Sequence, residues 1–80
     1  MNLEKMNARS AFAITPNDGA DISPTAMALY IGGAGDVKVD TVGGDTVTFS
    51  AANAGQYLNI QVKRVYSTGT TATLILGLIP

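Results

Sequence analysis

Short runs of alternating apolar and polar residues recur along the whole chain of 80 residues, separated by glycine, asparagine and proline. Successive side chains of a β-strand point to opposite faces, so a period of two predicts half-buried strands. We predict about six strands, at residues 10–15, 26–31, 36–40, 46–49, 58–63 and 71–79. Short strands at this even spacing predict an all-β fold, either a small antiparallel β-barrel or a jelly-roll-like sandwich.

The segment from Ala26 to Ser50 predicts a three-stranded antiparallel meander, because two glycine-rich breaks divide it into three runs. Gly32–Asp36 and Gly43–Asp45 are the expected hairpin tips, since glycine reaches the positive φ of tight turns without a Cβ clash. We expect both tips to be exposed at one end of the domain.

The first and last predicted strands differ in how much apolar surface they carry. Residues 10–15 are bulky and apolar on one face only, which predicts an edge strand. Residues 71–79 are apolar on both faces, with leucine and isoleucine in turn. Such a strand is expected in the centre of a sheet or against a neighbouring subunit.

Turn-forming residues punctuate the chain between these strands. Pro16–Gly19 combines proline, asparagine, aspartate and glycine, each of which favours a turn for its own physical reason. Residues 20–25 contain Pro24 and predict an irregular connection, and residues 67–70 predict a further turn. We therefore expect an N-terminal arm at residues 1–10 and a single β domain at residues 11–80.

The composition favours a protein that works in permanent contact with other chains. Charged residues make up 14 % of the sequence, below the roughly 25 % typical of soluble domains. Small domains usually need an additional source of stability, and the absence of cysteine and histidine excludes disulfides and thiolate zinc sites. Oligomerisation or docking on a larger body is then the expected source. Six acidic and five basic residues, without a basic patch, argue against nucleic acid as a partner.

The sequence offers little equipment for catalysis. A nucleophilic serine needs an adjacent base, usually histidine, and the chain has none. Asp36, Asp40 and Asp45 could form an acid–base pair, and Asp18 and Asp21 could bind calcium. Aspartate beside glycine in a turn more often bonds to the backbone, and the spacing matches no calcium-loop pattern. We predict no catalytic residues, no cofactor and no metal site, and a protein that is not an enzyme.

The two ends of the sequence also bear on where the protein is expected. Residues 1–10 include Glu4 and lack the apolar core of a secretory signal, so we expect synthesis in the cytoplasm. The most apolar run, residues 74–79, is far shorter than the ~20 residues of a membrane-spanning helix. A buried strand is the expected form of this run, and no membrane contact is predicted.

Three stretches together resemble a known family. They are ITPNDGADI at residues 14–22, ALYIGGAGDVKVDTVGGDTVTF at residues 28–49 and KRVYSTGTTAT at residues 63–73. In this order the chain resembles the small spike-base proteins in the capsid gene clusters of gene transfer agents and tailed bacteriophages. Each motif alone contains only residues typical of turns, whereas the order of the three motifs is specific to the family. Residues 1–10 match no motif of the family.

The resemblance implies a structural virion protein on the capsid exterior. It implies a vertex spike base or head decoration protein that links the shell to a fibre, with the major capsid protein and a spike fibre protein as partners. It also implies a homo-oligomer, with a pentamer favoured over a trimer. The predicted contact residues are Met1, Leu3, Met6 and Arg9 toward the capsid, and Tyr30, Gly33, Asp36, Leu76 and Ile79 on the domain.

An alternative function also fits the residues. A small monomeric β module could bind a carbohydrate or another ligand through an exposed tyrosine near a loop. The two hypotheses differ in the oligomeric state and in saturable glycan binding.

Overall fold

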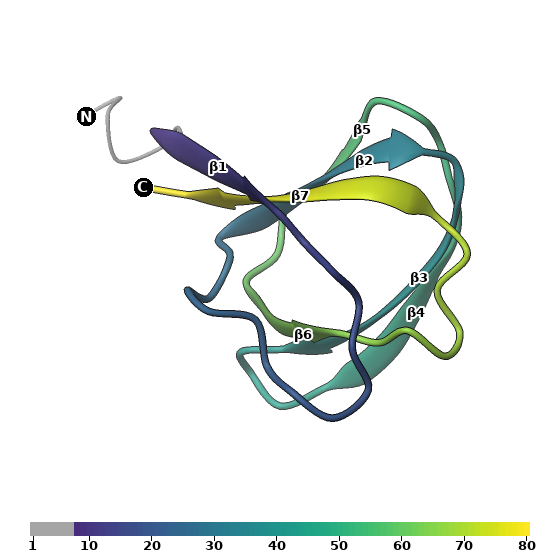
Figure 1. Cartoon of the computed structure of the whole chain (residues 1–80), viewed down its shortest axis with the longest axis horizontal. Helices are drawn as coiled ribbons and strands as arrows, with labels where there is room; N and C mark the ends of the chain where they lie inside the picture. The colour runs from purple at the N-terminus through teal and green to yellow at the C-terminus, as the bar shows by residue number, and fades with distance from the viewer. Residues whose placement is uncertain (1–7) are drawn as a thin grey trace.

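The structure is a computed structural model that describes residues 8–80, and it contains two antiparallel sheets packed face to face (Figure 1). The strands are β1 (Ser10–Ala13), β2 (Ala28–Gly33), β3 (Gly35–Thr41), β4 (Thr46–Ala52), β5 (Gln56–Leu58), β6 (Val62–Val65) and β7 (Thr73–Ile79). Sheet A has the order β1-β7-β2-β5, and sheet B has the order β4-β3-β6. The predicted all-β fold is confirmed in its sandwich form, because the sheets of the described residues do not close into a barrel.

The core lies between the two sheets and is built from alternate residues of the strands. The largest fully buried side chains are Leu29, Ile31, Val37, Val39, Val62 and Val65. The register of β6 against β3 skips Lys63, so Val62 and Val65 both point inward although they are three residues apart. The bulge thus places two valines of a four-residue strand in the core.

The predicted three-stranded meander from Ala26 to Ser50 is wrong. β2 belongs to sheet A, whereas β3 and β4 belong to sheet B. The break at Gly32–Asp36 therefore carries the chain from one sheet to the other and is not a hairpin tip. A Cβ added at Gly35 would lie 2.5 Å from the backbone nitrogen of Ala72. Glycine serves here for close approach of two segments, a requirement that looks like a turn signal in the sequence.

The second glycine-rich break, Gly43–Asp45, forms a hairpin as predicted. It joins β3 to β4, and the Thr41 N–H donates a hydrogen bond of 2.8 Å to the Asp45 carbonyl oxygen. Gly44 has a φ of 100°, which a residue with a Cβ would adopt only with strain. All three residues of this tip are exposed.

The predicted strand at residues 58–63 is two strands in different sheets. The chain leaves sheet A after Leu58 and enters sheet B at Val62. Between them the Ile60 N–H donates a 2.9 Å hydrogen bond to the Leu58 carbonyl oxygen, which marks a tight turn. Ile60 packs against the core from this crossing, so the apolar alternation continues although the strand does not.

The first and last strands of the chain take the places in sheet A that the sequence predicted. β7 lies between β1 and β2, which confirms the central placement of the last strand, although it begins at Thr73 and not at residue 71. β1 is an edge strand, as predicted. The division into an arm at residues 1–10 and a domain at residues 11–80 stays a prediction, since residues 1–7 lie outside the described part. β1 begins at Ser10.

The predicted connections also hold. The Gly19 N–H donates to the Asn17 Oδ1 atom at 2.8 Å within the turn after β1, and residues 20–25 follow an irregular path. Residues 67–70 form the turn that precedes β7. Within residues 8–80, the structure has no helix of the length and apolarity that a membrane span requires.

Candidate functional site

The outward side of sheet A forms one continuous apolar surface, which we call the apolar face. It consists of Ala11, Ala13, Ala28, Tyr30, Tyr57, Leu74, Leu76 and Leu78. The register lines these residues up across the strands, because Leu76 has Ala13 on one side and Tyr30 on the other. Tyr30 in turn pairs with Tyr57. No outward position of the four strands carries a charged residue.

Two side chains of the apolar face stand out into solvent. Leu74 is 78 % exposed and Tyr57 is 57 % exposed. Tyr57 meets Tyr30 edge to face with ring centroids 5.3 Å apart. Leu74 has a φ of 53°, a conformation that costs free energy for a residue with a Cβ. A Cβ at Gly32 would lie 2.6 Å from the Leu74 Cβ, so Gly32 provides the space for this strained leucine.

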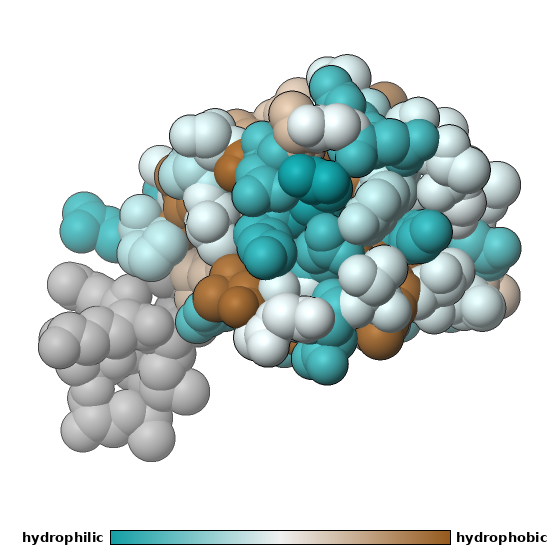
Figure 2. Space-filling view, turned by 90° about the horizontal axis from the view of Figure 1, so that it is seen from below, coloured by the Kyte–Doolittle hydropathy of each residue, from teal (hydrophilic) through white to brown (hydrophobic). Residues whose placement is uncertain are grey.

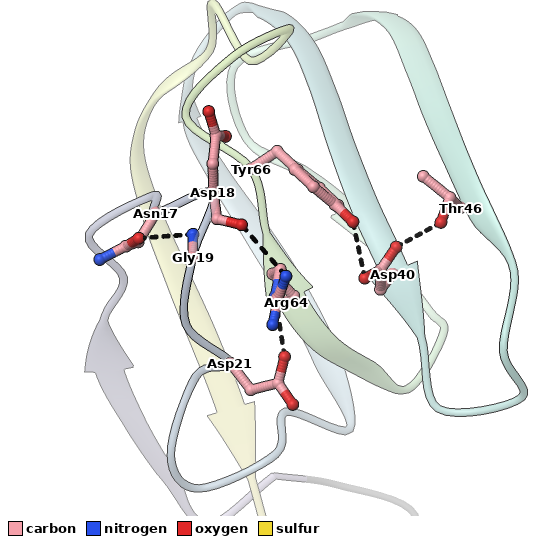
Figure 3. Close-up of polar contacts among 8 residues, drawn as sticks. All are labelled: Asn17, Asp18, Gly19, Asp21, Asp40, Thr46, Arg64 and Tyr66. Carbon is pink, nitrogen blue, oxygen red and sulfur yellow. Dashed lines mark hydrogen bonds and ion pairs between the residues drawn. The ribbon is translucent and has the colours of Figure 1, made fainter.

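The outward side of sheet B has the opposite character. Its residues interact with one another, as Figure 3 shows for the cluster around Asp40. The Tyr66 hydroxyl donates to the Asp40 Oδ2 atom at 2.8 Å, and the Thr46 hydroxyl donates to the Oδ1 atom. The Lys38 ammonium lies 4.8 Å from the centre of the Tyr66 ring, a distance suited to a cation–π interaction.

A second part of this polar network ties the connection after β1 to sheet B. The Arg64 Nε atom donates to the Asp21 carboxylate at 2.8 Å, and the Nη1 atom donates to the Asp18 carbonyl oxygen at 3.1 Å (Figure 3). The Asp18 carboxylate accepts hydrogen bonds from the backbone and hydroxyl of Thr68. The lower side of the molecule, where this connection and β6 lie, is mostly hydrophilic with isolated apolar residues (Figure 2).

These hydrogen bonds shift the acidity of the groups that take part. The Thr46 hydroxyl, and after it the Tyr66 hydroxyl, hold the pKa of the Asp40 carboxyl below its ordinary value. The Thr68 hydroxyl does the same for the pKa of Asp18. Hydrogen bonding to Asp21 raises the pKa of the Arg64 guanidinium. All of these shifts favour the charged forms and therefore stabilise the network at neutral pH.

The carboxylates that we considered for catalysis or calcium binding have structural partners. Asp36 accepts from the Ala51 N–H at 2.8 Å, and Asp45 accepts from the Thr41 hydroxyl at 3.3 Å. Asp18 and Asp21 bond as described above. Among residues 8–80, no group of three or more acidic side chains is placed to hold a metal ion.

The structure brings together only some of the predicted contact residues. Tyr30 and Leu76 are direct neighbours on the apolar face. Ile79 is half-buried at the end of β7, where its carbonyl oxygen accepts from the Arg9 N–H at 2.8 Å. Gly33 pairs with Thr73. Asp36 lies in the polar part of β3, and Met1, Leu3 and Met6 lie outside the described residues.

Sequence reasoning missed most of the apolar face. Its two exposed large side chains, Tyr57 and Leu74, were not among the predicted contact residues. The alternation in β7 gave a usable signal, because three leucines share one face and the isoleucines the other. The sequence could not tell which of these two faces turns toward sheet B.

Comparison with known proteins relates the chain to a virus-like particle. No protein-family description and no curated protein matches it. A chain in the capsid of the native GTA (gene transfer agent) particle, computed with C5 symmetry, superposes with a TM-score of 0.82. The two chains are 35 % identical, and the match covers 98 % of this chain and 89 % of that chain. The chain belongs to the family of this GTA capsid chain.

Membership in a GTA capsid family agrees with an exposed apolar face on a structural particle protein. The relationship supports a structural role and a location in a virion or particle. It also supports the gene transfer agent part of the family resemblance found in the sequence. The apolar face is therefore the candidate functional surface of a capsid-related protein.

Proposed function

We propose that this protein is a capsid vertex spike base or head decoration protein on the exterior of a phage-like particle, where it links the shell to a fibre. The observation that carries the proposal is the apolar face of sheet A. Its outward residues are uncharged in four neighbouring strands, and Leu74 projects from it with 78 % of its surface exposed. Contiguous apolar surfaces of this kind mark interaction sites in soluble proteins.

The apolar face suits a permanent contact better than a transient one. Charged residues are depleted, and aromatic residues enriched, at the centres of stable interfaces. The Tyr30–Tyr57 pair and Leu76 provide such a centre. We assign the apolar face to the capsid shell, with the major capsid protein as partner. The predicted capsid contacts at Met1, Leu3, Met6 and Arg9 precede β1, the edge strand of the same sheet.

A ring of five copies is the assembly that we favour, with a trimer as the other possibility. The related capsid was computed with C5 symmetry, and a vertex is the part of a capsid where a fivefold ring shares the symmetry of the shell. Heterologous contacts between the side of one copy and the next close into a ring when the rotation allows it. The predicted contacts at Gly33, Asp36 and Ile79 belong to this proposal.

A non-enzymatic role completes the proposal. The carboxylates available for acid–base chemistry accept hydrogen bonds from neighbouring backbone and hydroxyl groups. The chain also contains no histidine or cysteine. Its role is then to hold the shell and the fibre in a fixed relative position through its contacts.

The test combines the native mass with binding to particles that lack the protein. Light scattering on a sizing column, at several concentrations, should give a constant mass of five chains. Leu76→Asp should weaken particle binding at least 10-fold, since it places a charge in the centre of the apolar face. Val42→Asp is the matched control, because Val42 is exposed in the β3–β4 hairpin outside the apolar face.

Two outcomes contradict the proposal. Equal particle binding by both variants would show that the apolar face does not contact the capsid. A folded monomer that ignores the particles and binds a glycan saturably would favour the carbohydrate-binding alternative, with the exposed Tyr57 as its first candidate residue.

A further inference from the structure

β4 is a sheet edge whose one protective feature is a bulge near its end, where the register against β3 shifts between Gly35 and Val37. It runs for seven residues, TVTFSAA, along the outside of sheet B and contains no charged residue and no proline. Natural proteins protect open edges with lysine, proline or short strands, because unpaired N–H and C=O groups recruit other chains. The outer side of β4 has no strand partner among the described residues. An edge of this kind is suited to pairing in an assembled state.

The opposite edge of sheet B is already occupied. The Asn17 N–H donates to the Val65 carbonyl oxygen at 2.9 Å, and the Ile22 N–H donates to the Lys63 carbonyl oxygen at 2.8 Å. The connection after β1 therefore lies along β6. Since β4 and β6 are the two ends of sheet B, the open β4 edge and this connection lie on opposite sides of the sandwich.

Within residues 8–80, β1 is the second edge without a strand partner on its outer side, and a groove lies beside it. Backbone hydrogen bonds from the Arg9 and Ile14 N–H groups to β7 show that its extended run is longer than the four-residue strand. β5, the other edge of sheet A, has only three residues. The groove has a volume of about 280 Å³ and lies between β1 and the connection that follows it. Its lining is mixed, with Phe12, Ile14 and Ile22 beside the polar residues Asn17 and Asp21.

Two side chains of β4 suit the apolar part of this groove. Val47 and Phe49 point to the core side of sheet B, opposite Val39 and Val37. Val47 is nevertheless 39 % exposed and Phe49 is only half-buried, because no further strand covers them. An apolar projection on one side of a molecule and a groove with some apolar lining on the other are compatible with a heterologous contact between copies.

We propose that β4 of one copy adds to β1 of the next copy and places Val47 and Phe49 in the groove beside β1. The inference rests on the proposed function and specifies how neighbouring copies of the ring meet. Main-chain hydrogen bonds supply the pairing, as in β-strand addition generally. Neither strand carries a charge that would be buried. Repetition from copy to copy removes both open edges, whereas pairing of two β4 strands would leave β1 open.

Cysteine cross-linking tests the proposal cleanly, because the natural chain contains no cysteine. Ala13 and Thr48 are exposed and face outward on β1 and β4. In the double variant Ala13→Cys/Thr48→Cys, a short bis-maleimide should link β4 of each copy to β1 of the next. Denaturing gels of the ring in solution should then show a ladder that ends at the ring size.

Matched variants separate this contact from other arrangements. Each single variant should give no cross-linked product, and a mixture of the two should give dimers only. Thr48→Cys/Asn59→Cys is the control, since Asn59 is an exposed residue between β5 and β6. Circular dichroism should show an unchanged fold in all four proteins.

Three outcomes overturn the inference. Dimers from Thr48→Cys alone would show twofold pairing of β4 with β4. A ring of unchanged mass without a ladder would show that another surface closes it, and the proposed function would stand. Absence of both the ring and particle binding would reject the proposed function together with the inference.

Discussion

The outward faces of the two sheets use the same backbone architecture for opposite purposes. On sheet B, Asp40 accepts hydrogen bonds from Tyr66 and Thr46, and Arg64 pairs with Asp21, so the polar groups are matched within one molecule. On sheet A, the outward residues are alanine, leucine and tyrosine, and Leu74 remains 78 % exposed.

The difference shows which face of the molecule has its interactions satisfied within one chain. A polar face with internal partners is stable in water and needs no other chain. An uncharged face of the apolar kind keeps its unfavourable contact with water until another surface covers it. Under the proposed function, this asymmetry orients the domain with sheet A toward the capsid shell.

The largest expected difference in stability is between substitutions on the two faces of β7. Ile75→Ala should lower the free energy of unfolding by about 2–5 kcal/mol, because Ile75 is buried against sheet B and the change leaves a cavity. Leu74→Ala should change it by about 0.5 kcal/mol or less, because the adjacent leucine faces solvent. Denaturant unfolding of the two variants measures both values.

Both substitutions shorten a branched four-carbon side chain to alanine, and they lie on opposite faces of β7. Alanine at residue 74 keeps the same backbone strain as leucine, so the comparison reports the side chain alone. Equal losses of stability in the two variants would contradict the assignment of the apolar face to the outside of the monomer.

A smaller effect is expected on the polar face. Tyr66→Phe removes the hydroxyl that donates to Asp40 and should cost about 0.5–1.5 kcal/mol in the free energy of unfolding. Tyr57→Phe is the control on the apolar face, where no hydrogen bond of the Tyr57 hydroxyl is found within the described residues. Its expected change is close to zero. A larger cost for Tyr57→Phe than for Tyr66→Phe would reverse the contrast between the two faces.

The smallest effect concerns pH. The folded-state pKa values of Asp40 and Asp18 lie below the ordinary 3.8, so the unfolded chain binds more protons than the native protein in this range. Their contribution is present above pH 3.8 and is lost as the pH falls through the lower folded values.

Asp40→Asn tests this contribution directly. The free energy of unfolding of the natural protein should fall more steeply between pH 5 and about pH 2 than that of the variant. If the free energies of unfolding of the two proteins depended on pH in the same way, the hydrogen bonds to Asp40 would not favour its charged form.

The local sequence determined the positions of several strands and turns. Alternation with a period of two identified β1, β3 and β7, and the turn residues at Pro16–Gly19 and Gly43–Asp45 marked real turns. These features are predictable because strand alternation and turn geometry depend on near neighbours in the chain. The order of three motifs also indicated the gene transfer agent family before the fold was known.

Tertiary structure decided which segments share a sheet and which face is covered. Gly32–Asp36 has the composition of a hairpin tip but crosses between sheets, and residues 58–63 keep their alternation through a turn. Both depend on partners distant in sequence, such as Ala72 beside Gly35. In β7, both faces are apolar, so the sequence left open which one turns inward. Packing against sheet B placed Ile75 in the core and left Leu74, Leu76 and Leu78 on the outside.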